Sequence, residues 1–245
     1  MVANQPPAIA DTPWKEPLHD PGPAVVFDID GVLADMRPFQ YLIEAETSRQ
    51  KQWSEFHRKF EKATPIKAGL ITAKRIYDEL DIDVAYSTTR PEQHARRTLR
   101  WFEKNDLPMG PIQFRHFVRD GPRPAIDVKL RHWWYWQDRW AEKNPVLAWI
   151  EDDPAAMHAL RAHGCPAWGP NELKVAARKQ SSLKAALEAG PEDWDVLAKA
   201  KKDSYKRWRV AEDEWQAVRK QWWQEERQRQ RQRRVERNPR GQGRR

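Results

Sequence analysis

The sequence is poor in the residues that build disulfide-rich, zinc-binding and membrane-spanning proteins. Cys165 is the only cysteine among 245 residues, which excludes an intramolecular disulfide and a cluster of cysteine ligands for zinc. We expect this residue to be a small buried side chain. No apolar run approaches the length of a membrane span, and the segment after Met1 lacks the apolar core of a signal peptide. These absences lead us to expect a cytoplasmic protein without a membrane segment.

Two familiar ligand-binding patterns are also missing. The phosphate-cradling pattern Gly-x-x-x-x-Gly-Lys-Ser/Thr occurs nowhere, so we expect no P-loop kinase domain. The seven histidines show no metal-ligand spacing, since His158 and His163 lie five residues apart, off a common helix face. We expect all seven to be structural or on the surface, with His116 the nearest to a substrate.

Residues 24–35, Ala-Val-Val-Phe-Asp-Ile-Asp-Gly-Val-Leu-Ala-Asp, carry the most informative pattern. Four apolar residues in a row suit a strand buried on both faces, as in a parallel α/β sheet. Asp28 and Asp30 would then lie beyond the carboxyl end of a strand, where such sheets bind ligands. Two carboxylates this close repel each other unless a cation or a shared proton separates them. Alone, the pattern also fits an ordinary strand end with an Asp-Gly turn.

Three further segments favour chemistry over an ordinary turn. Residues 84–91 read as a second strand that ends in hydroxyls and an arginine, and residues 146–154 as a third that ends in acids. Between them, Lys129 starts a helix-like segment. The acids before Pro154 also suit the N-cap of a helix, and both roles can hold at one strand end.

These four segments, in this order, resemble the motifs of the haloacid dehalogenase (HAD) superfamily of phosphatases. The resemblance implies that Asp28 attacks phosphorus to form an aspartyl-phosphate and that Asp30 is the general acid and base. It implies a phosphate-binding hydroxyl at Thr88, with Ser87 as the alternative, and a charge-stabilising cation at Lys129. Arg90 would fork onto a phosphate.

The resemblance also implies a Mg²⁺ site. Asp28 would be a ligand through its side chain and Asp30 through its backbone carbonyl. Asp152 is our first choice in the acidic segment, flanked by Glu151 and Asp153, one of which would orient the lysine or a metal-bound water. The predicted metal residues are therefore Asp28, Asp30, Asp152 and Asp153.

Residues 24–172 are more specifically similar to the phosphatase domains of phage polynucleotide kinase/3′-phosphatases. The similarity lies in the order of the motifs, the paired Arg96 and Arg97, the arginine-bearing loop before Lys129 and the aromatic residues after it. Arg115 and Arg123 of that loop, with Arg90, are candidates to bind a neighbouring backbone phosphate. The tryptophans just after Lys129 are expected to pack on the sheet, although one or two of them would be placed to stack on a terminal base.

The chain length allows one α/β domain with extensions. We expect a proline-rich irregular lead-in over residues 1–23 and a three-layer, Rossmann-like domain with a parallel sheet over 24–190. A small helical cap would be inserted at about 36–65. Helices are predicted at 66–80 and 91–105 from apolar spacing, the latter beginning at Pro91. A helical extension, residues 191–245, would follow.

The predicted extension has two features. Trp208, Trp215 and Trp222 repeat every seven residues, a stripe that suits packing on the domain or a dimer through a partner helix. Residues 227–245 carry nine arginines and one acid, Glu236, so the remaining chain has equal numbers of basic and acidic residues. Such a tail is typical of an arm that binds nucleic acid, or of a solvated, frayed helix end.

The sequence thus predicts a Mg²⁺-dependent phosphomonoesterase that removes 3′-phosphates from nucleic-acid ends. A second interpretation is a 5′(3′)-deoxyribonucleotidase that acts on free mononucleotides, and a third is a phosphatase of small metabolites. A fourth, of another class, is a non-catalytic nucleic-acid-binding protein on a phosphatase fold. DNA and RNA ends are not distinguished.

Overall fold

The computed structural model describes residues 21–44, 52–121 and 123–191, and beyond these only positions 210, 220, 224 and 228. The chain divides into two compact units, residues 1–202 and 203–245. All helices and strands with assigned bounds belong to the first unit. The tryptophan stripe, nearly all of the arginine-rich tail and most of the proline-rich lead-in lie outside the described residues.

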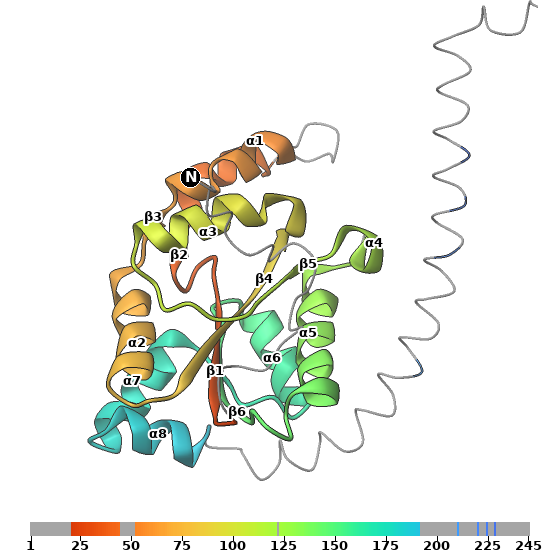
Figure 1. Ribbon diagram of the computed structural model, residues 1–245. Helices are drawn as coiled ribbons and strands as arrows, with labels where there is room; N and C mark the ends of the chain where they lie inside the picture. The colour runs from red at the N-terminus through yellow and green to blue at the C-terminus, as the bar shows by residue number, and fades with distance from the viewer. Residues whose placement is uncertain are drawn as a thin grey trace, which may run out of the picture. The chain divides into compact units, whose positions relative to one another are not determined.

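A parallel five-stranded sheet forms the centre of the first unit (Figure 1). Its strands are β1 (Ala24–Asp28), β4 (Asp83–Pro91), β5 (Ile112–Arg115), β6 (Val146–Ile150) and β7 (Ala167–Trp168), in the order β5-β4-β1-β6-β7. Every residue of β1 is buried, as its apolar run predicts for a strand covered on both faces. The predicted parallel α/β sheet is confirmed.

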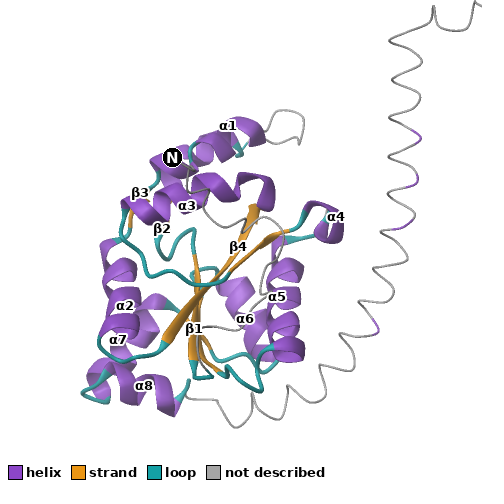
Figure 2. Cartoon of the chain, viewed as in Figure 1, coloured by secondary structure: helices purple, strands orange, loops and turns teal. Residues whose placement is uncertain are grey.

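Helices cover both faces of this sheet (Figure 2). On one side lie α2 (Lys67–Asp78), α7 (Pro170–Lys179) and α8 (Leu183–Ala189), and on the other α5 (Ala125–Arg139) and α6 (Pro154–Ala162). The predicted helix at 66–80 corresponds to α2. The helix predicted from Pro91 begins later, as α3 (Ala95–Lys104), because Pro91 still pairs within β4 and a 3₁₀ turn, η4 (Glu92–His94), follows it.

A small helical insert follows β1. It contains η2 (Arg37–Leu42), α1 (Trp53–Arg58) and η3 (Phe60–Lys62). Two short antiparallel strands, β2 (Ala34–Asp35) and β3 (Thr64–Pro65), pair at its base. In Figure 1 this insert lies at the end of the sheet where β1 and β4 terminate, so it borders the edge where the sequence predicts the site. The bounds of the predicted domains remain predictions.

The tryptophans after Lys129 belong to the core. Trp133, Trp134, Trp136 and Trp140 are each at most 6% exposed, and Trp133 lies edge-on to Trp149 of β6. None of the four is therefore placed to stack on a substrate base, and that alternative is wrong in this structure. No described helix is both long and apolar enough to cross a membrane.

Candidate active site

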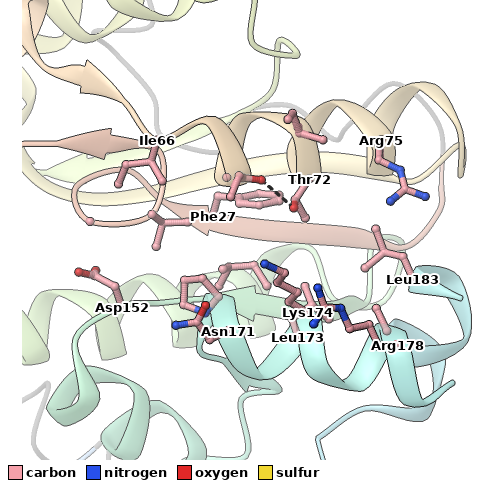
Figure 3. Close-up of a pocket in the computed structure, with 18 of the residues that line it drawn as sticks. Phe27, Ile66, Thr72, Arg75, Asp152, Asn171, Leu173, Lys174, Arg178 and Leu183 are labelled. Atoms are coloured by element: carbon pink, nitrogen blue, oxygen red, sulfur yellow. Dashed lines mark hydrogen bonds between the residues drawn. The ribbon is translucent and has the colours of Figure 1, made fainter. Parts of the chain in front are cut away.

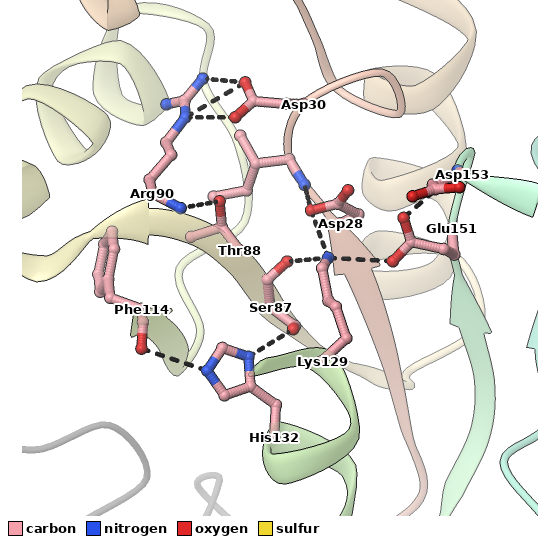
Figure 4. A network of polar contacts seen from close by, with 11 residues as sticks. Asp28, Asp30, Ser87, Thr88, Arg90, Phe114, Lys129, His132, Glu151 and Asp153 are labelled. Carbon is pink, nitrogen blue, oxygen red and sulfur yellow. Dashed lines mark hydrogen bonds and ion pairs between the residues drawn. The ribbon is translucent and has the colours of Figure 1, made fainter. Parts of the chain in front are cut away.

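Three neighbouring strands bring the predicted residues together at one edge of the sheet (Figure 4). Asp28 ends β1 and pairs with Ser87 of β4. Glu151 directly follows β6, on the other side of β1. Lys129 reaches the same edge from α5. The site thus lies at the carboxyl ends of parallel strands, the expected location in an open α/β sheet.

The buried Lys129 ammonium lies at the centre of the site, among three oxygen atoms. Its Nζ is 2.6 Å from Asp28 Oδ1 and 3.0 Å from Glu151 Oε2, and it donates to the Ser87 carbonyl oxygen at 3.0 Å. Burial alone would lower the pKa of Lys129, but Asp28 and then Glu151 raise it above its ordinary value. The side chain therefore stays cationic at the place predicted for a charge-stabilising lysine.

Asp28, Glu151 and Asp152 form an acidic group in which one carboxylate oxygen from each lies within 4.8 Å of the others. Burial and then the charge of Glu151 raise the pKa of Asp28. Partial burial of its carboxylate and then the charge of Asp28 raise the pKa of Asp152 to about 6. Three carboxylates around one ammonium leave an excess of negative charge. Carboxylates with space for water and substrate oxygens are the donor set that Mg²⁺ prefers, so these residues fit that ion.

Gly31 allows Asp152 to enter this group. Its φ is +84°, a left-handed conformation that suits glycine. A Cβ at this position would lie 1.8 Å from Asp152 Oδ2, far inside van der Waals contact. Glycine is therefore required both by the turn after β1 and by the close approach of the carboxylate.

The other two predicted metal residues point elsewhere. Asp153 is the N-cap of α6, where its Oδ1 accepts from the Ala155 amide at 2.9 Å, as its capping interpretation predicts. The Asp30 side chain turns to Arg90, and its predicted role as a ligand through the backbone carbonyl remains a prediction. Of the predicted set, the structure brings Asp28 and Asp152 together and adds Glu151.

Arg90 holds the Asp30 carboxylate with a fork of hydrogen bonds. Its Nη2 donates to Asp30 Oδ1 at 2.6 Å and its Nε to Oδ2 at 3.0 Å. The arginine side chain is 1% exposed, its Nη1 donates to Thr98 Oγ1, and its guanidinium carbon lies 4.2 Å above the Phe60 ring. In this structure the guanidinium contacts a site residue rather than open space. Its predicted contact with a substrate phosphate remains a prediction.

The two candidate hydroxyls have different partners. Ser87 Oγ lies 2.8 Å from His132 Nδ1, and His132 Nε2 lies 3.2 Å from the Phe114 carbonyl oxygen. Since a carbonyl only accepts, Nε2 carries the proton and Ser87 donates to Nδ1. Thr88 Oγ1 instead accepts from the Arg90 amide at 3.2 Å, so its own hydroxyl proton is available as a donor. This difference favours Thr88 as the phosphate-binding residue.

Arg115 and Arg123 lie in the segment between β5 and α5. Arg115 Nε donates to the Thr89 carbonyl at 3.3 Å and its Nη1 to the Arg123 carbonyl at 2.5 Å. Arg123 is 6% exposed. Arg115 therefore braces this segment against the end of β4, one residue beyond Thr88.

A groove of about 770 Å³ runs from Asp152 between α2 and α7 (Figure 3). Phe27, Leu173 and Leu183 give it apolar lining, and Arg75, Lys174 and Arg178 add positive charge. It adjoins the acidic group without including Lys129 or Thr88 among its lining residues. The groove is thus a neighbour of the site.

Sequence reasoning missed three residues that support the site, namely Thr98, Phe60 and His132. Each acts through another side chain: Thr98 lies 8 residues from Arg90, and Phe60 and His132 contact residues in other segments of the chain, so no local spacing signals these contacts. A buried arginine needs polar or ring contacts for its charge, and this requirement is the only signal that would have pointed to Thr98 and Phe60.

Comparison with known proteins finds partial structural likenesses. No protein-family model matches the sequence, and no curated protein matches it. Two chains from Pnkp1/Rnl/Hen1 RNA repair complexes have TM-scores of 0.46 and 0.47 at 15% and 14% identity; each match covers 64% of this chain. The matches cover 45% and 48% of those chains, so the likeness spans about half their length.

A third solved structure is a HAD family hydrolase from Deinococcus radiodurans R1 with bound phosphate and sodium. It has a TM-score of 0.42 at 17% identity, and the match covers 61% of this chain and 81% of that one. All three TM-scores lie below 0.5, so we take the function from the geometry of the site itself.

Proposed function

We propose that this protein is a Mg²⁺-dependent phosphomonoesterase that removes 3′-phosphates from nucleic-acid ends through an aspartyl-phosphate on Asp28. The observation that carries the proposal is the difference in environment between two carboxylates two residues apart. Asp28 is buried against Lys129, whereas Asp30 is held by Arg90 with its side chain 31% exposed. Different environments suit different roles, one carboxylate as nucleophile and the other as general acid and base.

The contacts of Asp28 indicate which of its oxygens reacts. Oδ1 accepts from the Ile29 amide at 2.7 Å and pairs with Lys129. Oδ2 is therefore the oxygen that we expect to attack phosphorus. As the bond between phosphorus and the 3′-oxygen breaks, Asp30 transfers its proton to that oxygen.

The second step releases the product. Water attacks the phosphorus of the aspartyl-phosphate, gives its proton to Asp30 and regenerates Asp28 with release of inorganic phosphate. Arg90 keeps Asp30 oriented through both proton transfers. Lys129 and the Thr88 hydroxyl would stabilise charge on the phosphoryl oxygens, the main task of a site for phosphoryl transfer.

Asp28, Asp152 and the Asp30 backbone carbonyl are the groups that would hold Mg²⁺, with Glu151 next to them. When bound, the ion would neutralise the carboxylates and polarise the phosphoryl group. Its removal is therefore expected to abolish turnover.

Charge supports a polymer substrate. Arg115 and Arg123 lie beside the end of β4, and the arginine-rich segment 227–245, most of which lies outside the described residues, would contact phosphates further along the chain. Deletion of 227–245 should weaken oligonucleotide binding and flatten its dependence on salt while leaving hydrolysis of a small phosphomonoester intact. An unchanged slope of log affinity against log salt concentration would refute the proposed role of residues 227–245 in binding.

The test of substrate is phosphate release with Mg²⁺ from a 3′-phosphorylated oligonucleotide, a 5′-phosphorylated one and free mononucleotides, with Asp28→Asn as the blank. We expect preference for the 3′-phosphorylated oligomer. Preference for mononucleotides would instead identify a nucleotidase, and preference for small sugar or alcohol phosphates a metabolite phosphatase. Oligonucleotide binding without any hydrolysis would favour the non-catalytic interpretation.

A further inference from the structure

The segment from Arg115 to Arg123 combines an exposed aromatic side chain with a group of arginines. It contains the short helix α4 (Phe117–Asp120), which in Figure 1 projects from the end of β5. Phe117 is 56% exposed. The ring lies on a loop beside the candidate active site, and such loops frequently carry binding residues.

Four arginines lie in or beside this loop: Arg115, Arg119 and Arg123 belong to the segment, and Arg131 reaches it from α5. The fully buried Asp120 pairs with Arg131, accepting from its Nε at 2.5 Å and its Nη2 at 2.9 Å. Asp120 Oδ2 also accepts from the His116 amide at 2.6 Å. These contacts fix the loop, so Phe117 projects from a braced segment.

The four arginines concentrate positive charge at this loop, where Asp120 pairs with Arg131. Burial and then the charge of Arg131 lower the pKa of Arg119, and burial lowers that of Arg115. An anion beside the group would offset this repulsion. Phosphate is the anion whose geometry best matches arginine.

The position of the group relates it to the catalytic centre. Arg115 donates to the carbonyl of Thr89, which follows the phosphate-binding candidate Thr88. A chain whose terminal phosphate lies at Thr88 and Lys129 would therefore have its next phosphate within the field of the arginines. An aromatic ring next to positive charge is the usual combination for single-stranded nucleic acid, since every base can stack and every linkage is anionic.

We propose that the α4 loop is a nucleotide subsite in which Phe117 stacks on the base of the penultimate nucleotide and the arginine group attracts the phosphodiester that joins it to the terminal nucleoside. This subsite rests on the proposed 3′-phosphatase function and deepens it. It explains how the enzyme would prefer a polymer end to a mononucleotide, because a nucleoside 3′-monophosphate has neither the second base nor the linking phosphate.

The first test compares Phe117→Ala and Arg119→Gln with controls outside the loop. Tyr77→Ala removes an exposed aromatic ring near the end of α2, and Arg139→Gln removes an exposed arginine at the end of α5. The readout is the ratio of kcat/KM for a 3′-phosphorylated tetranucleotide to kcat/KM for a nucleoside 3′-monophosphate. Because base stacking on the ring would be lost, Phe117→Ala should lower the ratio by about ten-fold, chiefly through KM.

The controls should leave the ratio unchanged. An unchanged ratio in Phe117→Ala, or the same fall in Tyr77→Ala, would overturn the subsite. Because Arg119 is half-buried, Arg119→Gln is interpreted only after its melting temperature matches that of the parent, and the exposed Phe117 gives an independent result.

Binding separates failure of the subsite from failure of the proposed function. In an Asp28→Asn background, fluorescence anisotropy with a labelled 3′-phosphorylated tetranucleotide needs no turnover. We expect Phe117→Ala to weaken this binding about ten-fold, within the range for base stacking. If the parent shows no 3′-phosphatase activity yet the loss of binding is seen, the chemistry fails and the subsite stands. If activity is present and binding is unaffected, the subsite is wrong.

Discussion

The two halves of the carboxyl edge of the sheet carry opposite charge. At the ends of β1 and β6, Asp28, Glu151 and Asp152 surround one ammonium. At the ends of β4 and β5, the arginines of the α4 loop lie around the Asp120–Arg131 ion pair and the Arg115 contacts. A divalent cation would neutralise the first half, and a phosphodiester is the ligand that we propose for the second. The proposed terminal phosphate lies between them, next to Thr88 and Lys129.

The largest expected effect comes from Asp28→Asn. The amide retains the size of the carboxylate but cannot form an aspartyl-phosphate, so turnover should fall at least about 10⁴-fold, as for loss of a catalytic nucleophile. The assay is steady-state phosphate release from the 3′-phosphorylated oligonucleotide. Residual activity within about ten-fold of the parent would remove Asp28 from the role of nucleophile.

Arg90→Lys distinguishes two roles for this buried arginine, positioning of Asp30 and binding of the substrate phosphate. Lysine keeps the charge but lacks the fork that holds Asp30. If Arg90 positions Asp30, kcat should fall about ten- to hundredfold with a changed pH profile and little change in KM. A raised KM with kcat preserved would show instead that Arg90 binds the substrate phosphate. Arg100→Lys, an exposed arginine paired with Glu61, is the matched control.

Gly31→Ala and Gly121→Ala test one substitution in each half. Both glycines have positive φ, +84° at Gly31 and +45° at Gly121. A Cβ at Gly31 would collide with Asp152, whereas a Cβ at Gly121 would have no neighbouring atom within 4 Å. Both variants should lose about 1–3 kcal/mol of stability from backbone strain. Only Gly31→Ala should also weaken Mg²⁺ binding, by about 10–100-fold. Isothermal titration with Mg²⁺ distinguishes them, and equal affinities would contradict the assignment of Asp152 to the metal.

The smallest predicted effect is a pH-dependent gain of thermal stability from Mg²⁺. Because the pKa of Asp152 is raised to about 6, its proton stabilises the metal-free fold at low pH, and this contribution is lost as the pH rises through 6. Mg²⁺ should reverse the loss above that pH, giving about 1–2 kcal/mol at ten times its Kd, or a few degrees in Tm. Below pH 5 the gain should shrink, since protons compete for the carboxylate. A gain of equal size at pH 5 and pH 8, or one that persists in Asp152→Asn, would contradict this account.

The sequence was sufficient for the sheet and the acidic half of the site because both depend on local patterns. The apolar run before Asp28 predicts a buried strand, and acids after a strand predict a position at its carboxyl end. The partner of Arg90 was not predictable, since Asp30, Thr98 and Phe60 come from three separate segments. Asp153 shows a further limit: a carboxylate after a strand suits a metal or a helix cap equally, and only the geometry shows that its side chain caps α6.

The most direct test of the central claim is to trap the covalent intermediate. The protein is mixed with Mg²⁺ and a 3′-phosphorylated oligonucleotide, quenched in acid during turnover, and digested for mass spectrometry. The account predicts a phosphorylated peptide that contains Asp28 in the parent and none in Asp28→Asn. Phosphate release in the parent without that peptide, or a phosphoryl group on another residue, would contradict it.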